Sequence, residues 1–160
     1  MQGNLTVYSA TGMYLIYTLL LLAGLVVSAP LYLWHFRRYA PTLPARLGRL
    51  KIPQLHGSIW VHAVSVGEVR AVAFLVQRLR KAYPARSIVL STTTMAGHDL
   101  AKGMKDGADH VIYFPFDLPW CVRKALNRVN PQFVIIAETE IWPNFLHECR
   151  RSEEHTSELQ

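Results

Sequence analysis

Four short apolar runs, each followed by a turn and a segment of helical periodicity, constrain the fold of this chain more than any other feature. The runs are rich in Val, Ile and aromatic residues, as buried strands are. Strands that alternate with helices require right-handed crossovers, so the sequence predicts an α/β fold: a parallel sheet with helices on both faces. The predicted strands are 59–63, 87–91, 110–114 and 133–137, and the predicted helices are 68–83, 95–105, 120–129 and one that begins at 144.

Polar turns follow the predicted strands, and a parallel sheet gathers such turns along one edge, where ligands bind. The first turn, Ser65 to Glu68, ends in a carboxylate that would open a helix and face the resulting crevice. A first-turn acid is also a common structural feature, because it complements the positive end of the helix dipole. The turn alone leaves both roles open for Glu68. The other three turns are 92–94, 116–119 and 138–144.

Hydroxyls and acids are concentrated in these turns. Three threonines end the second strand, where Thr94 fits the N-cap of the next helix, and three hydroxyls at a crevice also suit a sugar or a phosphate. In the third turn, Asp117 fits the N-cap of the helix that follows, with Pro119 in its first turn. The fourth turn carries Glu138 and Glu140, and two acids at a strand end are costly unless they are used.

The longest apolar stretch runs from Met13 to Trp34, about 22 residues without a charge, which is enough for a helix to cross the hydrocarbon core. The sequence therefore predicts one transmembrane helix near the N-terminus. Basic residues follow the stretch, so the positive-inside rule places the rest of the chain in the cytoplasm. A helix that lies in the membrane interface is the alternative. The basic residues are Arg37, Arg38, Arg46, Arg49 and Lys51.

Composition and motifs exclude several classes of function. The formal charge of +6 is dispersed, without a nucleic-acid motif, so an anionic membrane surface or an anionic substrate is a better partner than nucleic acid. Cys121 and Cys149 stand alone, which argues against a zinc site or a disulfide framework, and His62 is expected to be a satisfied sheet residue and not a ligand. The phosphate-binding glycine loops and the G-x-S-x-G elbow are missing, which argues against dinucleotide, P-loop and serine hydrolase functions.

Shifts in composition predict four regions along the chain. Residues 1–35 form the membrane anchor, and residues 36–57, broken by Pro and Gly, form a basic linker near the lipid head groups. Residues 58–150 form the α/β domain. Residues 151–160 do not continue the preceding helical pattern and resemble the translation of a sequencing adapter. We therefore expect them to be a non-native tail and the domain to be cut short.

Four segments, in this order and at this spacing, together resemble one known family. They are His62-Ala63-Val64-Ser65-Val66-Gly67-Glu68, Thr92-Thr93-Thr94 with Gly97, Phe116-Asp117-Leu118-Pro119, and Glu138-Thr139-Glu140-Ile141-Trp142-Pro143-Asn144. The family is that of the 3-deoxy-D-manno-octulosonic acid (Kdo) transferases of Gram-negative bacteria. The resemblance covers the predicted anchor through about Arg150, and the pairing of the first segment with the last is specific.

The resemblance implies the N-terminal, Rossmann-like domain of a two-domain GT-B glycosyltransferase, which works without a metal or cofactor at the inner face of the cytoplasmic membrane. Such an enzyme moves Kdo from CMP-Kdo to a lipid A precursor, and the missing C-terminal half would bind CMP-Kdo. Glu68 matches the family's proposed general base, and Glu138 an acid thought to assist the transition state. The implied substrate-binding residues are Ser65, Gly67, Thr92, Thr93, Thr94, Gly97, Glu140 and Asn144.

Two other functions fit parts of the pattern. Another membrane-surface GT-B enzyme, such as one acting on peptidoglycan precursors, would usually carry a Gly-rich first turn in place of Ser65 to Glu68. A non-catalytic, anchored Rossmann-like module that binds a partner or a lipid would not need the carboxylate of Glu68. Loss of activity on Glu68→Gln with the fold intact separates an enzyme from such a module.

Overall fold

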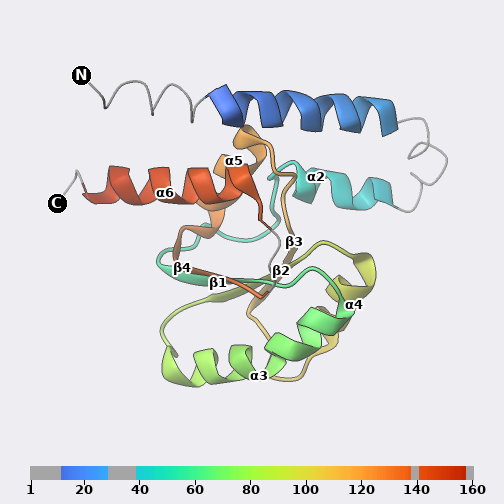
Figure 1. Cartoon of the computed structure of the whole chain (residues 1–160). Coiled ribbons are helices and arrows are strands. Elements are labelled where there is room, and N and C mark those ends of the chain that lie inside the picture. The colour runs from blue at the N-terminus through green and yellow to red at the C-terminus, as the bar shows by residue number, and fades with distance from the viewer. Residues whose placement is uncertain (1–11, 29–38, 138–140, 158–160) are drawn as a thin grey trace.

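The computed structural model describes residues 12–28, 39–137 and 141–157. Its centre is a sheet of four parallel strands in the order β3-β2-β1-β4 (Figure 1). The two interior strands are β2 and β1, and β1 pairs with β2 on one side and with β4 on the other. This arrangement confirms the predicted parallel α/β fold. The strands are β1 Ser58–His62, β2 Ile88–Thr92, β3 His110–Tyr113 and β4 Pro131–Ile136.

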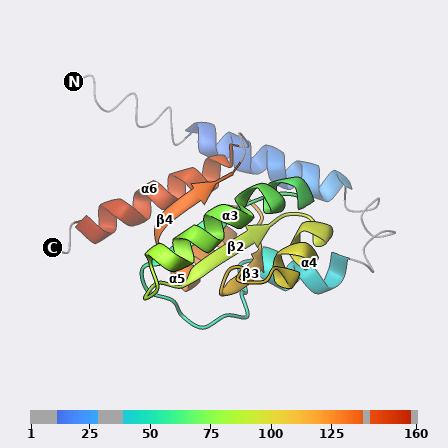
Figure 2. The ribbon, with the colours of Figure 1, turned by 90° about the horizontal axis from the view of Figure 1, so that it is seen from below.

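Helices cover both faces of the sheet (Figures 1 and 2). On one face lie α3, Val66–Ala82, and α4, Met95–Gly103. On the other lie α5, Pro119–Val129, and α6, Pro143–Ser157, together with the short η1, Ala40–Thr42, and α2, Leu43–Arg46. The predicted strand-helix units therefore form close to their predicted positions, because their apolar periodicities were distinct in the sequence.

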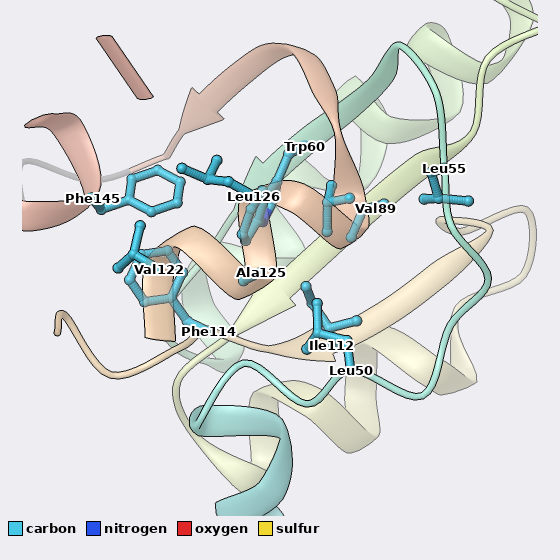
Figure 3. Close-up of a cluster of buried hydrophobic side chains, with 11 residues drawn as sticks. Leu50, Leu55, Trp60, Val89, Ile112, Phe114, Val122, Ala125, Leu126 and Phe145 are labelled. Carbon is cyan, nitrogen blue, oxygen red and sulfur yellow. The ribbon is translucent and has the colours of Figure 1, made fainter. Parts of the chain in front are cut away.

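The side chains of β1 and β2 alternate between two hydrophobic cores, as the period of a strand requires. Ile59 and Val61 pack under α3 and α4, whereas Trp60 packs under α5 and α6. Figure 3 shows Trp60 among the side chains of the second core. Its ring meets Phe145 of α6 edge to face, with centroids 5.2 Å apart, and its indole N–H donates to Ser91 Oγ at 2.8 Å.

Residues 39–57, the described part of the predicted linker 36–57, pack on the domain. Leu50 and Leu55 are buried in the core that contains Trp60, and the backbone N–H of Leu55 donates to the carbonyl of Arg128. Gly48 has a φ of +79°, and a Cβ added there would lie 2.5 Å from the carbonyl oxygen of Cys121 in α5. The segment can lie this close to α5 only because residue 48 has no side chain.

The N-terminal helix differs from the predicted span. Residues 12–28 are helical and lie beside the first turns of α6 in both views (Figures 1 and 2). In the part of the chain that the structure describes, no helix is both long and apolar enough to cross a membrane. Residues 29–34, the remainder of the predicted span, lie outside the described residues.

The last helix also differs from the prediction. A helix beginning at Asn144 was expected to lose its pattern after Arg150, but α6 starts at Pro143 and runs without a break to Ser157. On the preceding strand, β4, Phe133 is half exposed. This exposure follows from the position of β4 at the edge of the described sheet.

Neighbouring residues of α6 offer a matched test of the second core. We expect Phe145→Ala to lower the free energy of unfolding by about 3 to 5 kcal/mol, because Phe145 is fully buried against Trp60 and Phe114. Leu146→Ala, at a side chain that is 46% exposed, should change it by less than about 1 kcal/mol. Urea unfolding followed by tryptophan fluorescence measures both, and equal losses in the two variants would contradict this assignment of the core.

Candidate active site

Glu68 closes the turn between β1 and α3. Its carboxylate accepts two hydrogen bonds, one from the Ser65 hydroxyl at 2.8 Å and one from the backbone N–H of Val64. Glu68 lies in the first turn of α3, and Ser65 is the N-cap residue. Glu68 therefore has the structural role of a first-turn acid that was considered for it. A carboxylate has about four lone-pair positions, so two bonds orient this group and leave it able to accept a proton.

The second turn packs directly against the first. The carbonyl of Val64 accepts from the backbone N–H groups of both Thr93 and Thr94, at 3.1 and 3.0 Å. Gly97 lies just behind, where an added Cβ would be 3.2 Å from the carbonyl carbon of Ser65. Thr94 Oγ1 accepts from the N–H of Gly97 at 3.1 Å, which confirms Thr94 as the N-cap of α4. The structure thus brings the predicted residues of the first two turns together.

The predicted residues of these turns differ in how far their side chains are exposed to solvent. The side chain of Thr94 is exposed and that of Thr92 is buried, with its hydroxyl turned toward the carbonyl of Thr94 at 3.5 Å. The hydroxyl of Thr93 is buried and has no partner among the described residues. Gly67 is exposed, and the atom nearest to a Cβ added there is Ser65 Oγ at 3.9 Å. Space alone therefore does not require a glycine at position 67.

Asp117 caps a different helix from the one predicted. Its two carboxylate oxygens accept from the backbone N–H groups of Asn144 and Phe145, at 3.1 and 2.7 Å, so it caps α6. The N-cap of α5 is Leu118, without a side-chain bond. Asn144 and Phe145 begin a helix whose end is buried, so their N–H groups need an acceptor. Burial raises the pKa of Asp117, although the two N–H donors favour its ionised form.

Asn144, predicted to bind substrate, is buried in the same junction. Its side-chain amide donates to the backbone carbonyl of Asp117 at 2.5 Å, and its exposed fraction is 1%. Glu138 and Glu140, the acids of the fourth turn, lie outside the described residues. The backbone N–H of Ala137 donates to the carbonyl of His62 at 3.0 Å, so β4 ends beside the end of β1.

His62 is a buried residue at the end of β1, as predicted for a sheet residue, but it is only partly satisfied. Its Nδ1 lies 2.9 Å from Ser91 Oγ, and its ring stacks on Phe114 with centroids 4.0 Å apart. Its Nε2 is buried without a partner among the described residues. Burial lowers the pKa of His62 to about 4, against the opposing effects of the Ser91 carbonyl and the charge of Glu68. The side chain is therefore neutral at physiological pH.

Arg46 was predicted only as one of the basic linker residues, yet it reaches the second turn. Its guanidinium donates to the backbone carbonyl of Thr93 and lies over the ring of Tyr113, 4.9 Å from the centroid. Tyr113 also stacks on His98. No sequence pattern predicts this contact, because α2 has too few residues to show a periodicity. Among the described residues, no group of three His, Cys, Asp or Glu side chains is placed to hold a metal ion.

Comparison with known proteins identifies the family. The family described as 3-Deoxy-D-manno-octulosonic-acid transferase (kdotransferase) matches residues 41–156. The chain belongs to the Kdo transferase family. This result confirms the resemblance drawn from the four sequence segments, and the matched region contains all four strands and the turns that follow them.

Individual Kdo transferases show how much of such a protein the chain represents. A Kdo transferase of Haemophilus influenzae is 38% identical over 114 residues, which are 69% of this chain and 26% of that protein. One of Bordetella pertussis is 35% identical over 141 residues, 76% of this chain and 32% of that protein. A probable mitochondrial Kdo transferase of Arabidopsis thaliana is 32% identical over 114 residues, 70% and 24% respectively. The chain thus spans a third or less of these relatives.

The buried His62 makes stability depend on pH in a defined direction. Its pKa is about 4 in the folded protein against 6.5 when exposed, so between these values only the unfolded chain takes up the proton. We expect this residue alone to lower the free energy of unfolding by about 2 kcal/mol between pH 7 and pH 5. Urea unfolding of the wild type and of His62→Gln at both pH values measures the difference.

The matched control for that measurement is His56→Gln, because His56 is exposed. It should keep the pH dependence of the wild type, whereas His62→Gln should reduce it. A pH dependence that is the same in His62→Gln as in the wild type would show that His62 is not buried in its neutral form.

Proposed function

We propose that this chain is the acceptor-side part of a glycosyltransferase that moves Kdo from CMP-Kdo to a lipid A precursor. The observation that carries the proposal is the carboxylate of Glu68, held at the carboxyl ends of the parallel strands in a chain of the Kdo transferase family. The relatives of Haemophilus influenzae and Bordetella pertussis named above are Kdo transferases. The chain's own residues suit the acceptor half of that reaction.

Glu68 is the general base in this proposal. A hydroxyl of the acceptor sugar attacks the anomeric carbon of Kdo, the bond from that carbon to the CMP phosphate breaks, and the hydroxyl proton passes to the Glu68 carboxylate. The bonds from Ser65 and Val64 fix the carboxylate before substrate arrives. Glu138 supplies a second acid that supports the transition state. Neither a metal nor a resident cofactor takes part in the proposed step.

The first two turns hold the acceptor in this proposal. The backbone N–H groups of Thr93 and Thr94 donate to the carbonyl of Val64, and Gly97 packs against Ser65. An acceptor bound at one of these turns would therefore also meet the other. Arg46 adds a positive charge beside Thr93, which favours an anionic, phosphorylated acceptor. The other substrate contacts that we propose are Gly67, Thr94 and Glu140. Thr92 and Asn144, also predicted as contacts, are buried, and their side chains bond to the neighbouring backbone instead.

The acceptor is a membrane lipid, so we also propose where the enzyme works. The N-terminal apolar stretch attaches the protein to the bacterial inner membrane, and the domain faces the cytoplasm. Basic residues that follow the stretch bind anionic lipids. CMP-Kdo binds mainly to the part of the longer relatives that this chain does not match, which would complete a GT-B crevice.

Removal of the proposed base tests the mechanism in a complete enzyme that contains this sequence. We expect Glu68→Gln to lower the rate of Kdo transfer by about 100-fold to 10,000-fold, the usual contribution of a positioned base. Glutamine keeps one oxygen that accepts from Val64 or Ser65, so the melting temperature should fall only slightly. Transfer of labelled Kdo by the purified enzyme gives the rate.

Ser65→Ala is the matched control, because it removes one bond to Glu68 and keeps the carboxylate. It should retain far more activity than Glu68→Gln at a similar stability. Near wild-type transfer by Glu68→Gln would reject Glu68 as the base and would leave it only the structural role that the turn displays.

A polypeptide of these 160 residues should transfer no Kdo by itself. It spans a third or less of its relatives, and a GT-B crevice excludes water and closes only between two domains. Incubation of residues 36–150, and separately of the whole chain, with CMP-Kdo and lipid A precursor should give neither donor binding nor product. Turnover by either would show that the two-domain mechanism is wrong for this protein.

A further inference from the structure

The helix of residues 12–28 has two distinct faces. Its half-buried side chains recur at positions 14, 17, 18, 21, 22, 25 and 28, the spacing of one helix face. This face holds every polar side chain of the described helix: Tyr14, Tyr17, Thr18 and Ser28. The exposed face is wholly apolar, with exposed fractions of 57% to 76% for its large residues. Those residues are Met13, Leu15, Ile16, Leu19, Leu20, Val26 and Val27.

The polar face is attached to the domain at the start of α6. The Tyr17 hydroxyl donates to Asp117 Oδ2 at 3.0 Å, and the amide of Asn144 donates to Thr18 Oγ1 at 3.2 Å. One turn earlier, the ring of Tyr14 stacks on His147 with centroids 4.4 Å apart. Asp117 and Asn144 are the same residues that join the third turn to α6. We call these contacts of Tyr17 and Thr18 the latch.

We propose that residues 12–28 form a latched interfacial helix, which lies along the domain through Tyr17 and Thr18 and presents its apolar face to the acyl chains of a lipid bilayer. The proposal rests on the proposed function, since it specifies how the transferase meets its membrane. Tyrosine and threonine satisfy their polar groups on the protein side, so nothing on the exposed face needs water. Arg37, Arg38, Arg49 and Lys51 follow in the sequence and suit anionic head groups.

The latch and a transmembrane span exclude each other. A span that ends at Trp34 at the cytoplasmic surface puts Tyr17 about 25 Å away along the helix, at 1.5 Å per residue. That distance crosses most of a hydrocarbon core of about 30 Å. Tyr17 would then lie near the opposite surface of the membrane, whereas Asp117 belongs to the folded domain. The latch therefore favours the interfacial arrangement over the predicted span.

The side of the membrane on which residue 12 lies distinguishes the interfacial helix from a transmembrane span. The whole chain, with Cys121→Ala and Cys149→Ala, would carry a single cysteine as Gly12→Cys or as Lys51→Cys and be expressed in bacterial cells. An added Cβ at Gly12 meets no atom within 4 Å, and Lys51 is exposed. A membrane-impermeant maleimide should label both in inverted inner-membrane vesicles and neither in intact spheroplasts. Labelling of Gly12→Cys in spheroplasts only would overturn the latch in favour of a span.

The occupant of the apolar face is tested by a polarity-sensitive thiol dye on Leu20→Cys, with Leu21→Cys on the other face as control. Adding vesicles of phosphatidylethanolamine and phosphatidylglycerol should shift the emission of the dye at position 20 to the blue and protect it from iodide, with a smaller effect at position 21. Protection at position 20 before vesicles are added would indicate a second copy of the chain and overturn the lipid assignment. A dye that stays in water with vesicles present would do the same.

The latch itself is tested by the double variant Tyr17→Phe, Thr18→Val, which removes both hydroxyls and keeps the helix apolar. Spin labels on Leu20→Cys and Leu146→Cys, two exposed positions, should give a narrow distance distribution in vesicles, and the double variant should broaden it. Leu19→Val, on the exposed face, is the control and should not. An unchanged distribution in the double variant would show that these hydroxyls do not hold the helix.

The outcomes separate this proposal from the proposed function. A spanning helix would overturn the latch and leave Kdo transfer at the membrane intact, since that is tested by Glu68→Gln in a complete enzyme. A chain that does not bind vesicles would overturn both the latch and the membrane attachment. Inactive Glu68→Gln combined with same-side labelling of residues 12 and 51 would support both.

Discussion

The central position of β1 is the constraint on which the rest of the structure depends. All five of its residues are buried, and its backbone pairs in parallel with β2 and β4 at once. A parallel strand can pair on both sides only if helical crossovers return the chain over the sheet, so this pairing dictates helices on both faces. Parallel pairing also places the carboxyl ends of β1, β2 and β4 along the same edge of the sheet. The turn that holds Glu68 and the turn of threonines meet there because their strands are neighbours in register.

The features that the sequence predicted well are those set by local periodicity. The strands and helices form within a few residues of their predicted bounds, since alternating and helical patterns depend only on near neighbours. Thr94 caps α4 as predicted, because an N-cap bond closes within one turn. The carboxylate of Glu68 was singled out by its place after a strand, and its bonds to Val64 and Ser65 bear out the structural alternative. Its catalytic role stays a prediction.

The features that the sequence missed depend on contacts between distant segments. Asp117 precedes one helix and caps another, because the buried start of α6 lies within reach of its carboxylate in the fold. Leu50 and Leu55 stand in a stretch without periodicity, so nothing local marks them as core residues. Arg46 contacts Thr93, which lies 47 positions further along the chain. Such pairs become visible only when the sheet has placed both partners.

The lack of a side chain at Gly48 affects the charge at the candidate active site, although Gly48 does not contact that site. The chain passes α5 so closely there that a methyl group would collide with the carbonyl of Cys121. Two residues earlier, Arg46 carries its charge to the second turn. A larger residue at position 48 would move this segment away from α5. It would thereby pull the guanidinium of Arg46 away from the carbonyl of Thr93. The missing side chain at position 48 thus lets the segment lie close enough to α5 for Arg46 to reach Thr93. Replacing Gly48 would therefore weaken the attraction for an anion even though every proposed acceptor-binding side chain would still be present.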